Sequence, residues 1–139
     1  MNSTLLLSPG TRSTAGVLLL TLVAVESGGW LMLRVLRGKQ PATPFQQAFF
    51  RAGHAHAGVL VILALVSQIL VSATNVTGLL GFFATNGIWA AAILMSAGFF
   101  FSALGKNVTS PNRFIVILYL GAASLGAGVI SLGLGLLLA

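Results

Sequence analysis

Cysteine is absent from this chain of 139 residues, and Glu26 is its only acidic residue. Without cysteine there can be no disulfide, no thiolate nucleophile and no cysteine-ligated metal or iron–sulfur cluster. Charged residues of both signs make up only 6% of the chain, whereas ordinary soluble domains have roughly 25%. No nucleotide, phosphate or nucleophile motif occurs either. A soluble domain and an enzyme are therefore the least expected interpretations of the sequence.

Apolar residues, by contrast, are abundant, and 57% of the chain is hydrophobic. Four apolar stretches have about the 20 residues that a helix needs to cross roughly 30 Å of hydrocarbon. They lie at about 15–36, 48–73, 79–104 and 113–138. None has the polar face of a helix on the surface of a soluble protein. The sequence predicts an all-α integral membrane protein, a four-transmembrane-helix bundle that forms one domain over residues 1–139.

The basic residues are distributed unevenly between the two sides of this predicted bundle. Those that flank the first and third connections are Arg34, Arg37, Lys39, Arg51, Lys106 and Arg113, and only Arg12 lies on the other side. The positive-inside rule then places these two loops in the cytoplasm and both termini outside a multi-pass cell-membrane protein. The net charge of +6 therefore reflects topology and anionic lipid headgroups, and no nucleic-acid partner is expected.

Glu26 lies in the middle of the first apolar stretch. A charge near the bilayer centre costs at least about 2.5 to 3.5 kcal/mol, so such a group is usually paired, titrated or directed into a cavity. Counted from the cytoplasmic ends of their helices at 1.5 Å per residue, Glu26 is about 15 Å deep, His54 about 10 Å and His56 about 13 Å. Because the first two helices run antiparallel, we expect Glu26 and one histidine to meet in a buried polar site and to share a proton.

The second stretch supplies the other candidates for this site. On a regular helix, Arg51, His54 and Gln68 fall on one face, whereas His56 lies about 200° from His54. The two histidines therefore cannot chelate one metal ion from an undistorted helix. Metal candidates are His54, His56 and Glu26, and a bis-histidine haem would require one histidine from each copy of a dimer. No cofactor is predicted, although haem or a metal is possible.

Small residues recur at helical spacing in the fourth stretch. One stripe consists of Gly121, Ser124, Gly128, Ser131 and Gly135, and Ala122, Gly126 and Gly133 form a second stripe on another face. Small residues allow helix backbones to approach closely in lipid, where packing drives association. We expect the first stripe to pack helices together. The second could face the same bundle or another subunit, which makes a homo-oligomer or a complex with other membrane subunits a further expectation.

The first stretch resembles one family, the small multidrug resistance transporters. Those four-helix proteins have a single membrane-embedded glutamate in helix 1, followed by glycine, a basic residue and glycine at fixed offsets. Gly29, Arg34 and Gly38 stand at those offsets from Glu26. The resemblance implies a role for Glu26 in proton-linked transport. It is confined to this region, and the arginine–histidine cluster of the second stretch departs from the family pattern.

Three functions fit these observations. The first is proton-linked transport of a small molecule or ion, centred on Glu26 and His54. The second is a non-catalytic accessory or scaffold subunit of a membrane complex. The third is a membrane haem or metal-binding redox protein that uses the His54–His56 segment.

The charge distribution makes the topology testable. A reporter that is active only in the cytoplasm should be silent when it is fused after Ala139 and active when it is inserted near Gln40. A reporter active only outside the cytoplasm should give the reverse pattern. A strong cytoplasmic signal from the fusion after Ala139 would contradict the predicted orientation.

Overall fold

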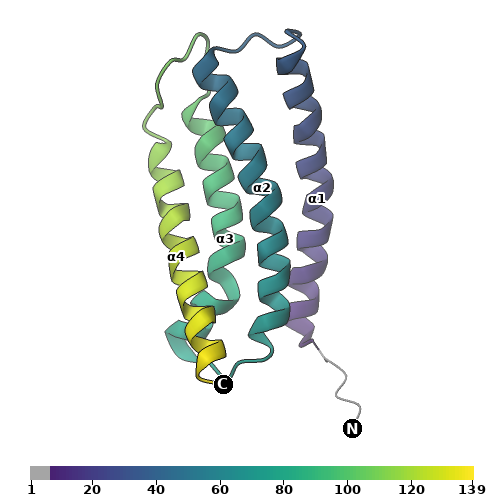
Figure 1. The fold of residues 1–139 in the computed structure, drawn as a ribbon, viewed down its shortest axis with the longest axis vertical. Helices are drawn as coiled ribbons and strands as arrows, with labels where there is room; N and C mark the ends of the chain where they lie inside the picture. Colours follow the sequence, from purple (N-terminus) through teal and green to yellow (C-terminus); the bar gives the residue numbers. More distant parts are fainter. Residues whose placement is uncertain (1–6) are drawn as a thin grey trace.

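The computed structural model describes residues 7–139, and the regular structure of this part of the chain is entirely helical. The helices are α1 (Pro9–Leu36), α2 (Pro44–Val71), α3 (Gly78–Ser102) and α4 (Ile115–Leu137). They run alternately up and down, with the α1–α2 and α3–α4 loops at the same end (Figure 1). Each helix is long and apolar enough to span a membrane. The predicted four-helix bundle is therefore confirmed.

The first two helices begin earlier than the apolar stretches predicted, because polar residues cap them. Ser8 Oγ accepts a hydrogen bond from the Thr11 backbone N–H at 3.2 Å, ahead of α1. Ahead of α2, Thr43 Oγ1 accepts from Gln46 N–H and Gln46 Oε1 accepts from Thr43 N–H, both at 3.1 Å. This reciprocal capping box satisfies backbone donors that would otherwise be free. Pro44 in the first turn of α2 fits, because that position needs no N–H donor.

The most intimate contact in the bundle lies between α3 and α4. A Cβ added to Gly87 would lie 2.7 Å from Gly128 Cα, and one added to Gly128 would lie 2.9 Å from the Ile88 nitrogen. Ser124 Oγ also donates to the Gly87 carbonyl across the two helices, at 2.8 Å. The helices therefore touch backbone to backbone, which only glycine permits at these two positions.

The two small-residue stripes of α4 have different surroundings. Gly121, Gly128, Ser131 and Gly135 are buried and Ser124 is half-buried. An added Cβ on Gly121 would meet Met95 of α3, and one on Gly135 would meet Val76 in the α2–α3 loop. On the second stripe, an added Cβ on Gly126 or Gly133 would meet no atom within 4 Å. The first stripe therefore packs inside this chain, and the second lies on the outer surface.

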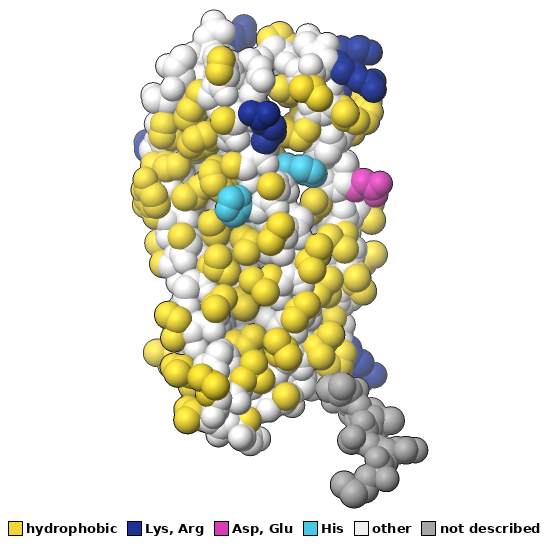
Figure 2. All heavy atoms as spheres, viewed as in Figure 1, with side chains coloured by type: hydrophobic (Ala, Val, Ile, Leu, Met, Phe, Trp, Pro, Cys, Tyr) yellow, Lys and Arg dark blue, Asp and Glu magenta, His cyan; other side chains and the backbone are white. Residues whose placement is uncertain are grey.

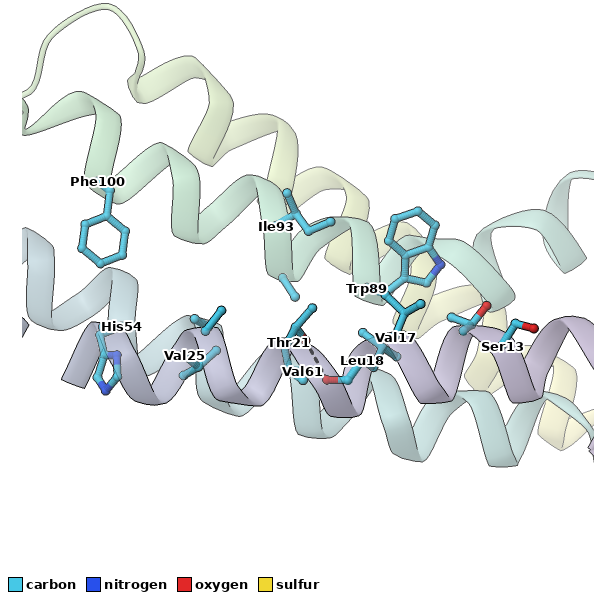
Figure 3. Close-up of a pocket in the computed structure, with 15 residues that line it drawn as sticks. Ser13, Val17, Leu18, Thr21, Val25, His54, Val61, Trp89, Ile93 and Phe100 are labelled. Carbon is cyan, nitrogen blue, oxygen red and sulfur yellow. Dashed lines mark hydrogen bonds between the residues drawn. The ribbon is translucent and has the colours of Figure 1, made fainter. Parts of the chain in front are cut away.

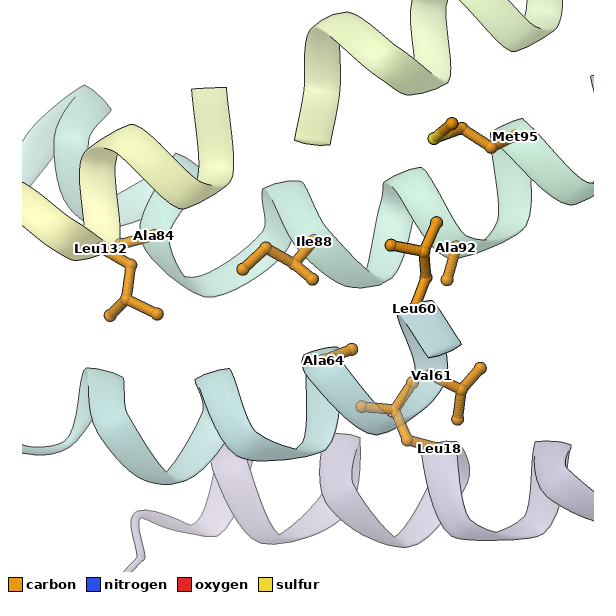
Figure 4. Packing of buried hydrophobic residues seen from close by; sticks show 9 residues of the cluster. All are labelled: Leu18, Leu60, Val61, Ala64, Ala84, Ile88, Ala92, Met95 and Leu132. Atoms are coloured by element: carbon orange, nitrogen blue, oxygen red, sulfur yellow. The ribbon is translucent and has the colours of Figure 1, made fainter. Parts of the chain in front are cut away.

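The apolar core is formed mainly by α2, α3 and α4 (Figure 4). Leu60 and Ala64 of α2 pack with Ile88 of α3 and Leu132 of α4. Helix α1 contributes only Leu18 to the buried members of this cluster. It packs mainly against α2. Helix α1 is therefore a peripheral helix laid against a three-helix unit.

A polar clamp joins α2 to the α3–α4 loop at the end of the bundle. Gln46 is buried, and its Nε2 donates to the carbonyls of Ala103 at 3.0 Å and Gly105 at 2.9 Å. Thr43 Oγ1 donates to the Val108 carbonyl beside it. These carbonyls follow the end of α3 and have no partner within a helix, so the bonds from Gln46 and Thr43 satisfy them. The same bonds fix the start of α2 against the end of α3.

The glycine contacts predict opposite effects of one substitution at two positions of α4. Gly128→Ala should destabilise the protein by at least about 1 kcal/mol, because the new methyl group overlaps the backbone of α3. Gly133→Ala is the matched control, since its methyl group meets open space. It should be neutral or stabilising by up to about 1 kcal/mol, because alanine is the better helix former. Thermal unfolding of both variants in detergent checks this, and equal stabilities would refute the α3–α4 contact.

Candidate functional site

The His54 imidazole lies in the seam between α1 and α2. It faces two consecutive glycines of α1. A Cβ added to Gly28 would lie 3.3 Å from His54 Nδ1, and one added to Gly29 would lie 3.5 Å from Nε2. The ring therefore occupies the space that side chains at positions 28 and 29 would fill if these residues were larger than glycine. The Gly28-Gly29 dipeptide is the local sequence feature that lets a histidine from α2 enter this contact.

The imidazole of His54 is half-buried and has no polar partner. Within residues 7–139, neither ring nitrogen of His54 forms a hydrogen bond. The two glycines of α1 lie against it, and Phe100 of α3, drawn above it in Figure 3, lines the same groove. A half-buried imidazole without a protein partner is a group that a ligand or a proton could engage.

His56 lies in a different environment. Its Nδ1–H donates to the Ala52 carbonyl at 2.8 Å, one turn earlier in α2. Its ring packs against Phe99 of α3, with 4.9 Å between the ring centroids. Helix α2 continues without interruption through both histidines. The two imidazoles therefore face different helices, and the described residues contain no group of three potential metal ligands.

Glu26 and Arg51 lie on the outer surface of the single chain rather than inside it. Both side chains are exposed. Figure 2 shows the acidic side chain and both imidazoles on one face of the molecule, at similar heights. Among residues 7–139, Glu26 forms no hydrogen bond or ion pair with His54 or Arg51. The predicted buried Glu26–His54 contact is thus absent from this conformation, although the two groups share one level of the membrane.

Gln68 is buried far from the histidines. It is 0% exposed, and its Nε2 donates to the Thr85 carbonyl of α3 at 2.8 Å. Its Oε1 has no partner in the described part of the chain. At 1.5 Å per residue, Gln68 lies about 21 Å along α2 from His54. It is therefore part of the α2–α3 contact and not part of the site around His54.

Beside the seam, a groove of about 550 Å³ lies between α1 and α3, with α2 as its floor. The α1 wall extends from Ser13 to Gly28, which is about 22 Å along the helix axis. Val17 on this wall and Ile93 on the opposite wall are each 61% exposed. The groove is therefore open along its side to the surrounding hydrocarbon, and it extends through most of the membrane depth.

The groove is lined almost entirely by apolar side chains, and His54 is the one ionisable residue in its lining (Figure 3). Farther along, the hydroxyls of Ser13 and Thr14 stand at the opposite end of the lining, and two other polar groups are hydrogen-bonded within the bundle. Thr21 Oγ1 donates to the Leu18 carbonyl at 2.6 Å, and Trp89 Nε1 donates to Asn86 Oδ1 at 3.2 Å. Glu26 is outside the groove, because it stands two residues from Gly28 and about 200° around α1.

Comparison with protein-family models, with curated proteins and with solved structures finds no match for this chain. What can be inferred about its function therefore depends on the groove and on the residues around His54.

Several site residues were not singled out from the sequence. Ile93 and Phe100 of α3 line the groove with Thr21 of α1, but each is an ordinary apolar or weakly polar residue in a membrane helix. Only the Gly28-Gly29 dipeptide, next to Glu26, carried a local signal. The groove itself arises because α1 contacts α2 and leaves α3 uncovered, which is a tertiary property.

A double-mutant cycle tests the separation of Glu26 from His54. Because the two side chains share no hydrogen bond here, the stability effects of Glu26→Gln and His54→Gln should add to within about 0.5 kcal/mol. Thermal or denaturant unfolding in detergent gives the four free energies. A coupling well above this value would mean that the pair meets in a second conformation, as the sequence-based hypothesis requires.

Proposed function

We propose that the protein is a small membrane transport protein that takes a lipophilic molecule into the groove between α1 and α3 and couples its movement to a proton on His54. The observation that carries this proposal is that His54, whose imidazole has no hydrogen-bond partner in residues 7–139, is the one ionisable residue in the lining of an apolar groove of about 550 Å³. Pockets of roughly 300 to 1,000 Å³ with few polar groups are typical of small-molecule sites.

The position of the groove supports movement across the membrane as well as binding. Its walls are exposed to hydrocarbon, so a lipophilic molecule can enter sideways from the bilayer. Its length of about 22 Å is most of the roughly 30 Å hydrocarbon thickness. A molecule that slides along α1 from Ser13 to Gly28 would therefore pass most of the barrier within one groove.

The attachment of α1 supports a change in the width of the groove. Only Thr11, Leu18 and Val35 are buried among the 28 residues of α1. Because α1 rests mainly on α2, tilting it about the His54 seam would alter its separation from α3, and Leu18 is the one buried core residue that would move with it. Elements with few buried contacts are the ones that move most readily.

A proton on His54 would link this movement to pH. Histidine is the side chain that ordinarily changes charge near neutral pH. In the seam, Gly28 and Gly29 offer no charge, and the charged residues closest in sequence on the two helices are Glu26 and Arg51, both exposed on the outer surface. A charged imidazole would attract a negatively charged group in the groove, whereas a neutral imidazole would not.

A second candidate function is that of an accessory subunit in a membrane complex. It is favoured by Glu26, a carboxylate exposed at membrane depth with no partner in residues 7–139. Covering it with another polypeptide would relieve a cost of about 2.5 kcal/mol or more. A stable complex with a different membrane protein after mild purification, with no uptake activity, would favour this candidate.

Transport can be tested by filling the groove. In proteoliposomes with an imposed pH gradient, the wild-type protein should accumulate at least one member of a panel of fluorescent lipophilic acids, cations and neutral molecules above protein-free liposomes. Ala24→Phe, which fills the groove, and His54→Leu should reduce this uptake to background.

Val23→Phe is the matched control, because Val23 is 67% exposed on the outer side of α1 and does not line the groove. It should transport as the wild type does. Equal uptake by Ala24→Phe and Val23→Phe would exclude the groove as the path, and no uptake of any compound by folded wild-type protein would refute transport.

A further inference from the structure

The lining of the groove also specifies a chemical class of ligand, and this step rests on the proposed function of the groove. We propose that the groove binds a single-chain amphiphilic acid, a long-chain carboxylic acid, with its carboxyl group at His54 and its hydrocarbon chain along α1 toward Ser13.

The first argument is the polarity of the two ends. His54 is at one end of the groove, the hydroxyls of Ser13 and Thr14 are at the other, and the length between them offers apolar walls such as Val17, Val61 and Ile93. One ionisable group at the end of a long apolar surface matches a molecule with one polar head and one long tail. A compact polar solute would leave most of this lining uncovered, and a plain hydrocarbon would leave the imidazole unpaired.

The second argument is the sign of the charge. No acidic residue lines the groove, and Glu26 faces away from it. The His54 end points toward the end of the bundle where the dark-blue basic side chains gather in Figure 2. That end holds six of the seven Lys and Arg residues of the chain. An imidazole that gains a proton, beneath a basic rim, attracts an anionic head and repels a cationic one.

The third argument is size. At about 30 Å³ for each water-sized group, a groove of about 550 Å³ holds on the order of 18 such groups. That is the size of one acyl chain with a carboxyl head. A two-chain phospholipid is more than twice as large, so at least one of its chains would lie outside. The volume therefore favours a single-chain acid over an anionic phospholipid.

The proton balance of binding is simple. The neutral acid enters from the bilayer, and its carboxyl O–H gives its proton to a ring nitrogen of His54. The products are a carboxylate and an imidazolium held together by a charge-assisted hydrogen bond. No other reactant is needed, and release of the neutral acid returns the proton from the imidazolium to the carboxylate.

Tryptophan fluorescence can test this proposal in the full-length chain. The chain has two tryptophans. Trp89 lines the groove, and Trp30 is 65% exposed on α1. In a Trp30→Phe background, hexadecanoic acid brominated near its methyl end should quench Trp89 saturably. Unlabelled hexadecanoic acid should reverse the quenching. A trimethylammonium compound with the same brominated chain measures head-group preference, and brominated phosphatidylglycerol measures the effect of a second chain.

The expected result is that the acid binds at least roughly tenfold more tightly than the cation, which is the range of one hydrogen bond to a charged group. His54→Leu should remove this preference, and His54→Gln, which keeps a polar side chain in the seam, should reduce it in the same direction. Glu26→Gln should leave the affinity for the acid unchanged, because Glu26 is outside the groove.

The outcomes separate this inference from the proposed function. Equal or tighter binding of the cation, or binding of the acid that is unchanged in both His54 variants, overturns the acid assignment and leaves a transport groove in place. Equal binding of the brominated phospholipid overturns the single-chain assignment. If no brominated compound quenches Trp89 saturably, both the acid assignment and the groove as a binding site are refuted.

Discussion

The backbone contact between α3 and α4 is the constraint on which the rest of the bundle depends. Lipid provides no hydrophobic drive for helices to associate, so the helices must gain more from packing against each other than against acyl chains. Gly87 and Gly128 provide this gain by allowing the two backbones to touch. Helix α2 then packs on the pair through Leu60 and Ala64, and the Gln46 clamp fixes its start. Helix α1 comes last in this order, and its loose attachment creates the groove.

His54 connects the two sides of the α1–α2 seam. The groove lies on one side, lined by Gly28, and the exposed Glu26 lies on the other. The imidazole in the seam is therefore in a position to respond to a ligand in the groove. Glu26 and the two imidazoles share one level of the membrane, as the residue counts along the first two helices predict. In this conformation, however, they are distributed over two surfaces.

Much of the fold could be predicted from the sequence, because the bilayer imposes it. Segment length and hydropathy identified four helices, and the spacing of Gly121, Gly128 and Gly135 identified a stripe that the structure places against neighbouring side chains and backbone. The site was harder to predict. Depth along a helix follows from counting residues, so the shared level of Glu26 and His54 could be estimated. The direction in which each side chain points depends on which helices touch, and the preference of α1 for α2 over α3 has no local signature.

The order of the helices along the chain has a consequence for biosynthesis. During synthesis α1 and α2 leave the ribosome first, but the tightest contact in the molecule forms between the last two helices. The first half of the chain is therefore inserted before the tightest contact can form, with only the contact between α1 and α2 available to it. Helices α1 and α2 are each long and apolar enough to span the membrane on their own before α3 and α4 are made. A chain truncated before Ile115 would leave Gly87 and Gly98 of α3, which lie against α4 in the full bundle, exposed to lipid.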